Sequence, residues 1–316
     1  MTSNNIFEVD IPAWVIFGTM SLTGILGNGF IVVVNGHQWL QNRRRIFCDF
    51  LLTSTSAFRL IMQLDLLLFN ILYYFRVNIR CIYREDITFF SWMFSKMISN
   101  WCATWLSVFY CVKVANFANP LFLWLKARIN MLVPRLLGLS IAVFMVSCLP
   151  SLVVYFGHTK CNLTETLLEN ASQGEVCSTP DFFFLPIQLF FYVINLCLST
   201  IAIILLLASL WKHTRNLKES GAGVKDLNTQ VHIKVMAFLL LWLFFYLLDF
   251  IGLIIHTNIT LNTLQLEELF VDILMSAFSS AHPIILILTN PKLKEMSACI
   301  IKNIYAHIVN IRHITL

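Results

Sequence analysis

Three aspartates stand inside long apolar segments of this sequence, where a membrane would make an ionisable side chain costly. Asp65, Asp249 and Asp272 each lie among aliphatic and aromatic residues, about two to three helical turns from the end that we place outside. An ionisable group inside a membrane helix costs about 2.5–3.5 kcal/mol on insertion scales, so it usually has a functional reason. Three carboxylates at similar depth predict a shared, wetted, negative cavity that favours cationic or hydrogen-bond-donating ligands. The alternative is that each acid is satisfied separately by a backbone or side-chain donor.

Two tryptophans are placed to complete such a site. Trp101 and Trp105 are spaced i, i+4, so in a helix they share one face. Small-molecule sites combine apolar walls with a few placed polar groups, and an indole ring that faces a carboxylate can hold a cation by its π face. The pair therefore indicates ligand binding. The alternative is an ordinary core or lipid contact, which aromatic pairs at this spacing also make.

Two lysines and an arginine also fall in apolar segments. Lys96 and Lys113 share one segment and would lie about 25 Å apart along a helix at 1.5 Å per residue. Each can therefore reach one of the two membrane interfaces with its long side chain, and the alternative for Lys113 is an inner polar network. Arg59 lies in the middle of its segment, where Asn28 of the first segment stands at similar depth. We expect these two residues to form a structural or switching network that does not contact ligand.

Composition and length define the elements that position these residues. Of the 316 residues, 58% are hydrophobic and 12% are charged, whereas an average soluble domain is about 25% charged. A membrane helix needs about 20 apolar residues, and the segments of that length run near 11–36, 46–75, 87–119, 131–156, 182–211, 231–257 and 265–290. We predict an all-α membrane protein with one domain over 1–316, a seven-transmembrane helix bundle. The tail, 291–316, is predicted to be a short amphipathic helix on the inner surface.

Lysine and arginine in the connecting segments set the orientation of the predicted bundle. Basic residues concentrate in 43–45, 126–128 and 212–218, and the link after the fourth segment is acidic. Positively charged links stay on the cytoplasmic side of a membrane. The N-terminus is therefore expected outside and the tail inside, although the arginines within 76–84 count against this orientation.

Sequons and cysteines lie on the predicted outer side as well. Three Asn-X-Ser/Thr sequons fall there, which supports the orientation and predicts glycosylation at Asn162, Asn170 and Asn258. Three cysteines fall there too, and the sequence leaves open how a disulfide would pair Cys81, Cys161 and Cys177.

The sequence lacks the motifs of the common enzyme and cofactor classes. It contains no HExxH, GxSxG, P-loop or dinucleotide fingerprint, and its histidines form no metal-ligand cluster. We therefore expect no enzyme activity, no metal and no cofactor. An intramembrane protease would need two aspartates such as those of the sixth and seventh segments, but their flanks, YLLDFIG and LFVDILM, lack a flexible glycine-rich setting. The net charge of +5 lies in short clusters between apolar runs, so we expect no nucleic-acid partner.

Six local strings carry a resemblance to a known family. They are GNGFIVVVN (27–35), SAFRL (56–60), WCATWLSVFYCVKVANFANPLFLWLK (101–126), LASLWKHTRNLK (207–218), VHIKVMAFLLLWLFFY (231–246) and HPIILILTNPKLK (282–294). Together they resemble the type 2 taste receptors, the bitter receptors among the G-protein-coupled receptors. The third-segment string is the most specific of the six.

This resemblance implies detection of varied bitter small molecules in an outer-half transmembrane pocket. It also implies signalling through a heterotrimeric G protein of the gustducin and inhibitory class. Trp101 and Tyr246 match family positions that line the pocket, and Asp272 matches a position that contacts ligand amines in some members. Asn162 matches the usual position of the family's glycan. Trp105 departs from the asparagine that is frequent in the family, which predicts a shallower and more aromatic floor.

Residues of the middle and inner half of the bundle would serve activation and coupling to the G protein. They are Asn28, Arg59, Lys113, His282, Lys292 and Lys294. We expect a multi-pass plasma-membrane protein, in contact with membrane lipids, whose bitter agonists include cations. Agonists would act by shifting the population of helix arrangements. The alternatives are a narrowly tuned chemosensory or amine receptor, and a transporter or channel.

Overall fold

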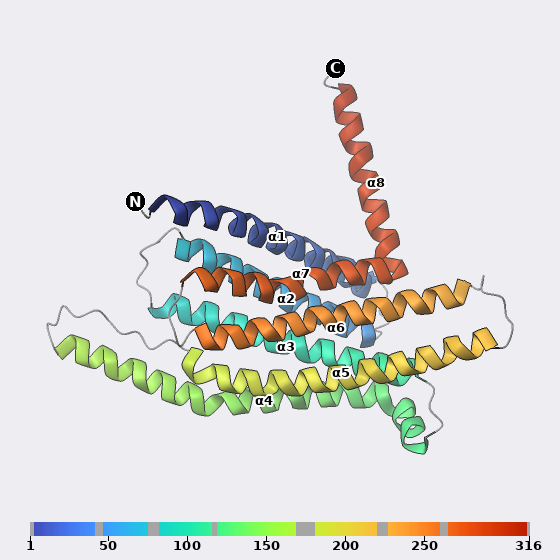
Figure 1. Cartoon of the computed structure of the whole chain (residues 1–316), viewed down its shortest axis with the longest axis horizontal. Coiled ribbons are helices and arrows are strands. Elements are labelled where there is room, and N and C mark those ends of the chain that lie inside the picture. The colour runs from blue at the N-terminus through green and yellow to red at the C-terminus, as the bar shows by residue number, and fades with distance from the viewer. Residues whose placement is uncertain are drawn as a thin grey trace.

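The described part of the chain is helical throughout. The computed structural model describes residues 3–41, 47–74, 82–115, 119–168, 181–219, 227–259 and 265–314. Within these ranges there are eight helices and no strand, which confirms the all-α prediction. The helices, shown in Figure 1, are α1 (Ser3–Gln41), α2 (Phe47–Tyr74), α3 (Ile82–Val114), α4 (Pro120–Leu168), α5 (Asp181–Glu219), α6 (Leu227–Ile259), α7 (Gln265–Thr289) and α8 (Pro291–Ile314).

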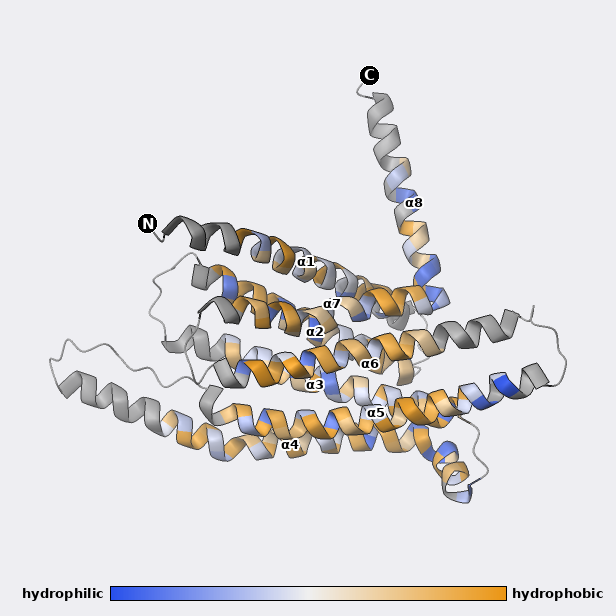
Figure 2. Ribbon diagram, in the orientation of Figure 1, coloured by the Kyte–Doolittle hydropathy of each residue, from blue (hydrophilic) through white to orange (hydrophobic). Residues whose placement is uncertain are grey.

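Six of the described helices are long and apolar enough to cross a membrane. Their candidate spans are Ile11–His37, Phe47–Ile71, Phe122–Gly157, Phe184–Lys212, Met236–His256 and Leu269–Thr289. Apolar side chains such as Val33 and Val153 are exposed on the outward faces of these helices, and Figure 2 shows apolar residues along their middle portions. Exposed aliphatic surface of this length is stable in lipid rather than in water. The described helices therefore support a multi-pass membrane bundle.

α3 is not among these six helices, and part of its buried face is polar. Ser95, Lys96, Asn100 and Thr104 are all buried on it. α3 packs against α2, α4 and α5, so these polar side chains face neighbouring helices rather than lipid. Polar groups inside a membrane bundle are stable when other helices supply their partners. This central position explains the lower apolarity of α3, and the count of seven spans remains a prediction.

Several helices continue beyond the predicted apolar segments. α4 runs from Pro120 to Leu168, whereas its apolar segment was predicted over 131–156, and α1 begins at Ser3. The backbone hydrogen bonds of a helix do not require apolar side chains, so a helix can extend into water past the end of its span. Hydropathy therefore predicts the membrane portion of each helix but not the residues at which the helix ends.

The tail forms a separate helix, as predicted, and α8 projects away from the bundle (Figure 1). The Asn290 side chain caps its first turn, because its Oδ1 accepts a hydrogen bond from the Lys292 backbone N–H at 3.1 Å. Pro291 occupies the first helical position, where a missing N–H costs nothing. Leu293 is fully buried against α1. The base of α8 is thus fixed to the bundle by one cap and one apolar contact.

The close approach of α1 and α7 depends on a glycine in α1. A Cβ atom at Gly27 would lie 2.9 Å from Cβ of Pro283, whereas a Cβ at Gly29 would meet nothing within 4 Å. Both changes to alanine gain about the same helix propensity, roughly 1 kcal/mol. Overpacking typically costs about 1–3 kcal/mol. We therefore expect Gly27→Ala to be less stable than Gly29→Ala by about 1–3 kcal/mol in thermal unfolding of the purified protein. Equal stability of the two variants would contradict the close contact.

Candidate functional site

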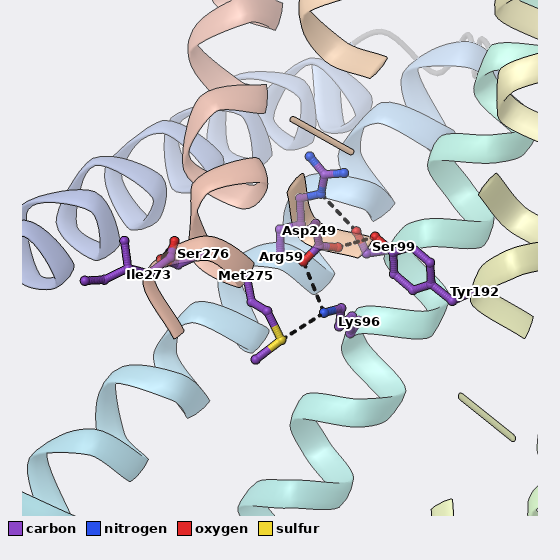
Figure 3. Close-up of polar contacts among 8 residues, drawn as sticks. All are labelled: Arg59, Lys96, Ser99, Tyr192, Asp249, Ile273, Met275 and Ser276. Atoms are coloured by element: carbon purple, nitrogen blue, oxygen red, sulfur yellow. Dashed lines mark hydrogen bonds and ion pairs between the residues drawn. The ribbon is translucent and has the colours of Figure 1, made fainter. Parts of the chain in front are cut away.

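The centre of the bundle contains a buried ion pair between α3 and α6. The Lys96 Nζ lies 3.1 Å from the Asp249 Oδ1, and the two side chains are 3% and 4% exposed. The second carboxylate oxygen, Oδ2, accepts a short hydrogen bond from the Tyr192 hydroxyl of α5. Figure 3 shows the Asp249 carboxylate between these two donors. Both oxygens of Asp249 are therefore occupied by side chains of the protein itself.

The Lys96 ammonium group is surrounded by groups that stabilise a cation. The Met275 Sδ lies 3.5 Å from Nζ, and the ring centroids of Trp92 and Tyr192 lie at 5.2 Å and 5.6 Å. Aromatic faces at such distances attract a cation electrostatically. The prediction that Lys96 reaches a membrane interface is therefore wrong, because a carboxylate across the bundle offers its charge a closer partner than the headgroup region does.

The other two intramembrane acids have partners of their own. The Ser91 hydroxyl donates to Asp65 Oδ2 at 2.6 Å, and the Asn70 side-chain amide donates to Asp272 Oδ2 at 2.8 Å. Both acids are half-buried. Hydrogen bonds from neutral donors leave the negative charge of a carboxylate in place. Asp65, Asp249 and Asp272 thus each have at least one side-chain partner of their own.

The two tryptophans of α3 lie in different surroundings. Trp101 is buried in the main core. Trp105 is half-buried, and its indole Nε1 donates to the Ser140 hydroxyl of α4 at 3.2 Å. The i, i+4 spacing places both side chains on one side of α3. Trp105 nevertheless contacts α4, because the two positions are not exactly in line along the helix. Trp105 therefore combines a core contact with a hydrogen bond that its indole N–H requires when buried.

Arg59 lies at the junction of α2, α3 and α7. Its side chain is fully buried, its Nε donates to the Ser99 hydroxyl at 3.0 Å, and its guanidinium carbon lies 4.2 Å from the Phe278 ring centroid. The predicted contact with Asn28 is not made. The Asn28 amide nitrogen donates instead to the Gly24 carbonyl of its own helix at 2.9 Å and to the Ser279 carbonyl of α7 at 3.1 Å. Similar depth in the membrane therefore did not identify the partners of either residue.

An aromatic cluster connects the ion pair to the part of α7 that carries His282. The Tyr246 ring stacks on Phe278 with centroids 5.2 Å apart and lies 5.3 Å from the Tyr192 ring. His282 follows one turn along α7, with its ring 6.1 Å from Phe278. Tyr246 and His282 are both buried. These residues provide a continuous packed path from Asp249 to the end of α7 that carries His282.

A polar seam between α3 and α5 was not predicted from the sequence. The Thr104 hydroxyl donates to the Asn195 side-chain carbonyl at 2.9 Å and lies at the same distance from the Ser199 hydroxyl. All three side chains are fully buried. The signal in the sequence was the i, i+4 spacing of Asn195 and Ser199 within an otherwise apolar run, since polar residues at that spacing share a helix face.

The three lysines predicted to serve activation and coupling are at least partly exposed. Lys113 is exposed, and its Nζ lies 5.7 Å from the Phe109 ring centroid. The Lys292 Nζ lies 3.9 Å from Asp49 Oδ2 of α2, and Lys294 is exposed on α8.

The side chains of the predicted glycosylation and disulfide sites lie outside the described residues. Asn162 and Asn258 fall within α4 and α6, but their side chains lie outside the described residues, as does the whole of Asn170. The side chains of Cys81, Cys161 and Cys177 also lie outside them. Among the described residues there is no group of three or more His, Cys, Asp or Glu side chains that could hold a metal ion.

Comparison with known proteins gives one consistent result. The family model described as "Taste receptor protein (TAS2R)" matches residues 8–304. The chain is 31% identical to "Taste receptor type 2 member 8" of Homo sapiens over 286 residues, which cover 87% of this chain and 90% of that protein. It is 32% identical to "Taste receptor type 2 member 41" of Gorilla gorilla gorilla, with 89% and 92% covered. "Taste receptor type 2 member 104" of Rattus norvegicus is also 32% identical, with 88% and 91% covered.

Proposed function

Because the chain belongs to the taste receptor type 2 family, we propose that it detects bitter small molecules in the outer half of the bundle and activates a gustducin-like heterotrimeric G protein. The observation that carries the proposal is the family match over residues 8–304, almost the whole chain. The family supports a bitter taste receptor of the G-protein-coupled class. The six long apolar helices agree with a receptor that crosses the membrane several times.

The proposed topology has seven spans, an outer N-terminus and an inner tail, in the plasma membrane. α3 would be the seventh span, because it lies between α2, α4 and α5 and its polar side chains are buried among them. The basic segments around 126–128 and 212–218 would then face the cytoplasm. α8 would lie against the lipid headgroups, with exposed Met296 and Ile300 entering the membrane surface beside its lysines.

The proposed ligand site combines aromatic walls with acidic groups. Trp101 and Tyr246 are buried aromatic side chains near the centre of the bundle, and Trp105 adds a half-buried indole. Asp65 and Asp272 supply half-buried carboxyl groups beside Ser91 and Asn70, which would suit agonists that carry a cationic or hydrogen-bond-donating group. Asp249 is the sixth member of the proposed set, and its carboxylate is already bound to Lys96.

The proposed mechanism is a shift between two arrangements of the helices. An agonist activates only if it binds one arrangement better than the other. Arg59 and Asn28 each connect α7 to another helix, so they would sense a displacement of α7. His282 lies further along α7, and Lys113, Lys292 and Lys294 lie at the ends of helices where the G protein would bind. These six residues form the proposed activation and coupling set.

A calcium-response screen tests this function. Cells that express the receptor with a chimeric taste G protein should respond to bitter compounds of several unrelated scaffolds, and cells without the receptor should not. A response to a single amine scaffold would favour a narrowly tuned amine receptor. Substrate flux or current that needs no G protein would favour a transporter or channel.

We expect Asp272→Asn to weaken cationic agonists about tenfold more than neutral agonists in this assay, because only cations lose a charge interaction worth about 1.4 kcal/mol. The matched control is Asn70→Ala, which removes the amide that donates to Asp272 but retains the carboxylate. This control should keep the preference for cations. An equal shift for both classes of agonist in Asp272→Asn would assign the acid a structural role.

A further inference from the structure

We propose that Lys96 is a specificity-determining residue of the ligand site: its ammonium group occupies a built-in cation site at Asp249 and keeps agonist amines out of it. The inference rests on the proposed function only in placing Asp249 within the ligand site. It assigns primary alkylammonium groups as the class of ligand that Asp249 would take if Lys96 were removed.

The surroundings of the Lys96 Nζ have the composition of a cation-binding site. A carboxylate oxygen lies at 3.1 Å, a thioether sulfur at 3.5 Å and two aromatic ring centroids at 5.2 Å and 5.6 Å. α3, α5, α6 and α7 each contribute a side chain to it, as Figure 3 shows in part. An ammonium group recognises these chemical groups whether it belongs to a lysine or to a small molecule.

The position of Lys96 makes it a competitor of any incoming amine. Asp249 Oδ1 receives Lys96 and Oδ2 receives the Tyr192 hydroxyl, so a second cation would have to share an oxygen with a donor that is already in place. A group tethered by a short chain acts at an effective concentration in the millimolar range or above. A free agonist amine must exceed that competition, and so cationic agonists of the wild-type receptor use Asp272 or Asp65 instead.

A second buried cation strengthens this exclusion. Arg59 is fully buried, and its charge interacts electrostatically with the Asp249 carboxylate. Among the described residues, Arg59 and Lys96 are the buried cations, and Asp249 is the buried carboxylate that faces them. The interior therefore already has an excess of positive charge, which repels a third cation as long as Lys96 remains.

Truncation of the lysine side chain provides a direct test. Lys96→Ala removes three methylene groups and the ammonium, and n-propylammonium supplies the same atoms. The full-length receptor, purified in nanodiscs, would be heated in the presence of increasing n-propylammonium, with 1-propanol as the uncharged control compound. We expect a saturable rise in melting temperature of about 2–4 °C for Lys96→Ala and no rise with 1-propanol.

Three matched proteins complete the experiment. The wild type keeps its own ammonium at the site, Lys96→Met fills the space without a charge, and Lys96→Ala/Asp249→Asn has the space without the carboxylate. None of the three should respond to n-propylammonium. A rise that is absent in Lys96→Ala, or equally large in any of the three controls, would overturn the proposal.

Folding of the truncated variant gives a second readout. If Lys96→Ala reaches the cell surface only when n-propylammonium is in the medium, while Lys96→Ala/Asp249→Asn reaches it without the amine, the cation site is supported. Failure of Lys96→Ala to appear with or without the amine would overturn it. Neither readout uses a bitter agonist or a G protein, so failure of the proposed function and failure of this inference are distinguishable.

Discussion

Replacement of Asp249 by asparagine should lower the free energy of unfolding by about 3–5 kcal/mol, one of the two largest effects we expect in this protein. The change leaves the Lys96 ammonium buried with no carboxylate in contact, and removal of one partner of a buried pair has this typical cost. Lys96 cannot easily escape, since its side chain is 3% exposed and lies between Asp249 and Met275. Thermal unfolding of the purified receptor and its abundance at the cell surface both measure the effect.

Two comparisons separate burial of the charge from loss of an ion pair as such. Lys292→Met removes the partner of Asp49, but these side chains are 40% and 26% exposed and 3.9 Å apart, so the cost should be at most about 1 kcal/mol. The double variant Lys96→Met/Asp249→Leu removes both charges and should recover most of the stability lost in Asp249→Asn. Equal losses in Asp249→Asn and Lys292→Met would contradict the buried pair.

Arg59→Met, in contrast to Asp249→Asn, should not lower the free energy of unfolding, but it should strongly weaken signalling. The free energy of unfolding should stay constant or rise by up to about 4 kcal/mol, because the change removes a buried charge that has no carboxylate of its own. Two of its nitrogens, Nη1 and Nη2, have no hydrogen-bond partner among the described residues. Agonist potency should nevertheless fall at least about tenfold, since the side chain joins Ser99 of α3 to Phe278 of α7.

Arg59→Lys provides the matched control for this prediction. It keeps a buried cation but loses the planar group that bonds Ser99 and stacks on Phe278, and it should therefore be less stable than both the wild type and Arg59→Met. Melting temperature and calcium response are measured on the same set of variants. A loss of stability in Arg59→Met as large as that in Asp249→Asn would show that Arg59 is needed to hold the fold.

The sequence predicted the helices well because apolar length is a local property. It identified the acids of the bundle as exceptional residues but not their partners, which depend on the packing of distant helices. Lys96 and Asp249 are 153 positions apart, and each is also compatible with a place near a membrane interface. Their opposite charges in the interiors of two segments were a usable signal for the ion pair.

Partners on neighbouring helices were missed for a related reason. Asn28 and Arg59 stand at similar depth, yet their side chains turn towards Ser279 and Ser99. The rotation of each helix about its axis decides such contacts, and depth alone does not determine it. Neutral donors such as Ser91 and Asn70 were equally hard to identify, because serine and asparagine occur throughout the apolar segments.

The distance between Lys96 and Asp249 along the chain also affects how the protein is made. α3 leaves the ribosome well before α6, and at about 5–20 residues per second the intervening 153 positions require about 8–30 s. During that interval the lysine has no carboxylate from α6, and its long side chain can satisfy its charge only near the headgroups. We therefore expect the nascent third helix to enter the bilayer in a shallower position than it has in the finished protein. Arrival of the sixth helix would then draw the ammonium inward and complete the centre of the bundle.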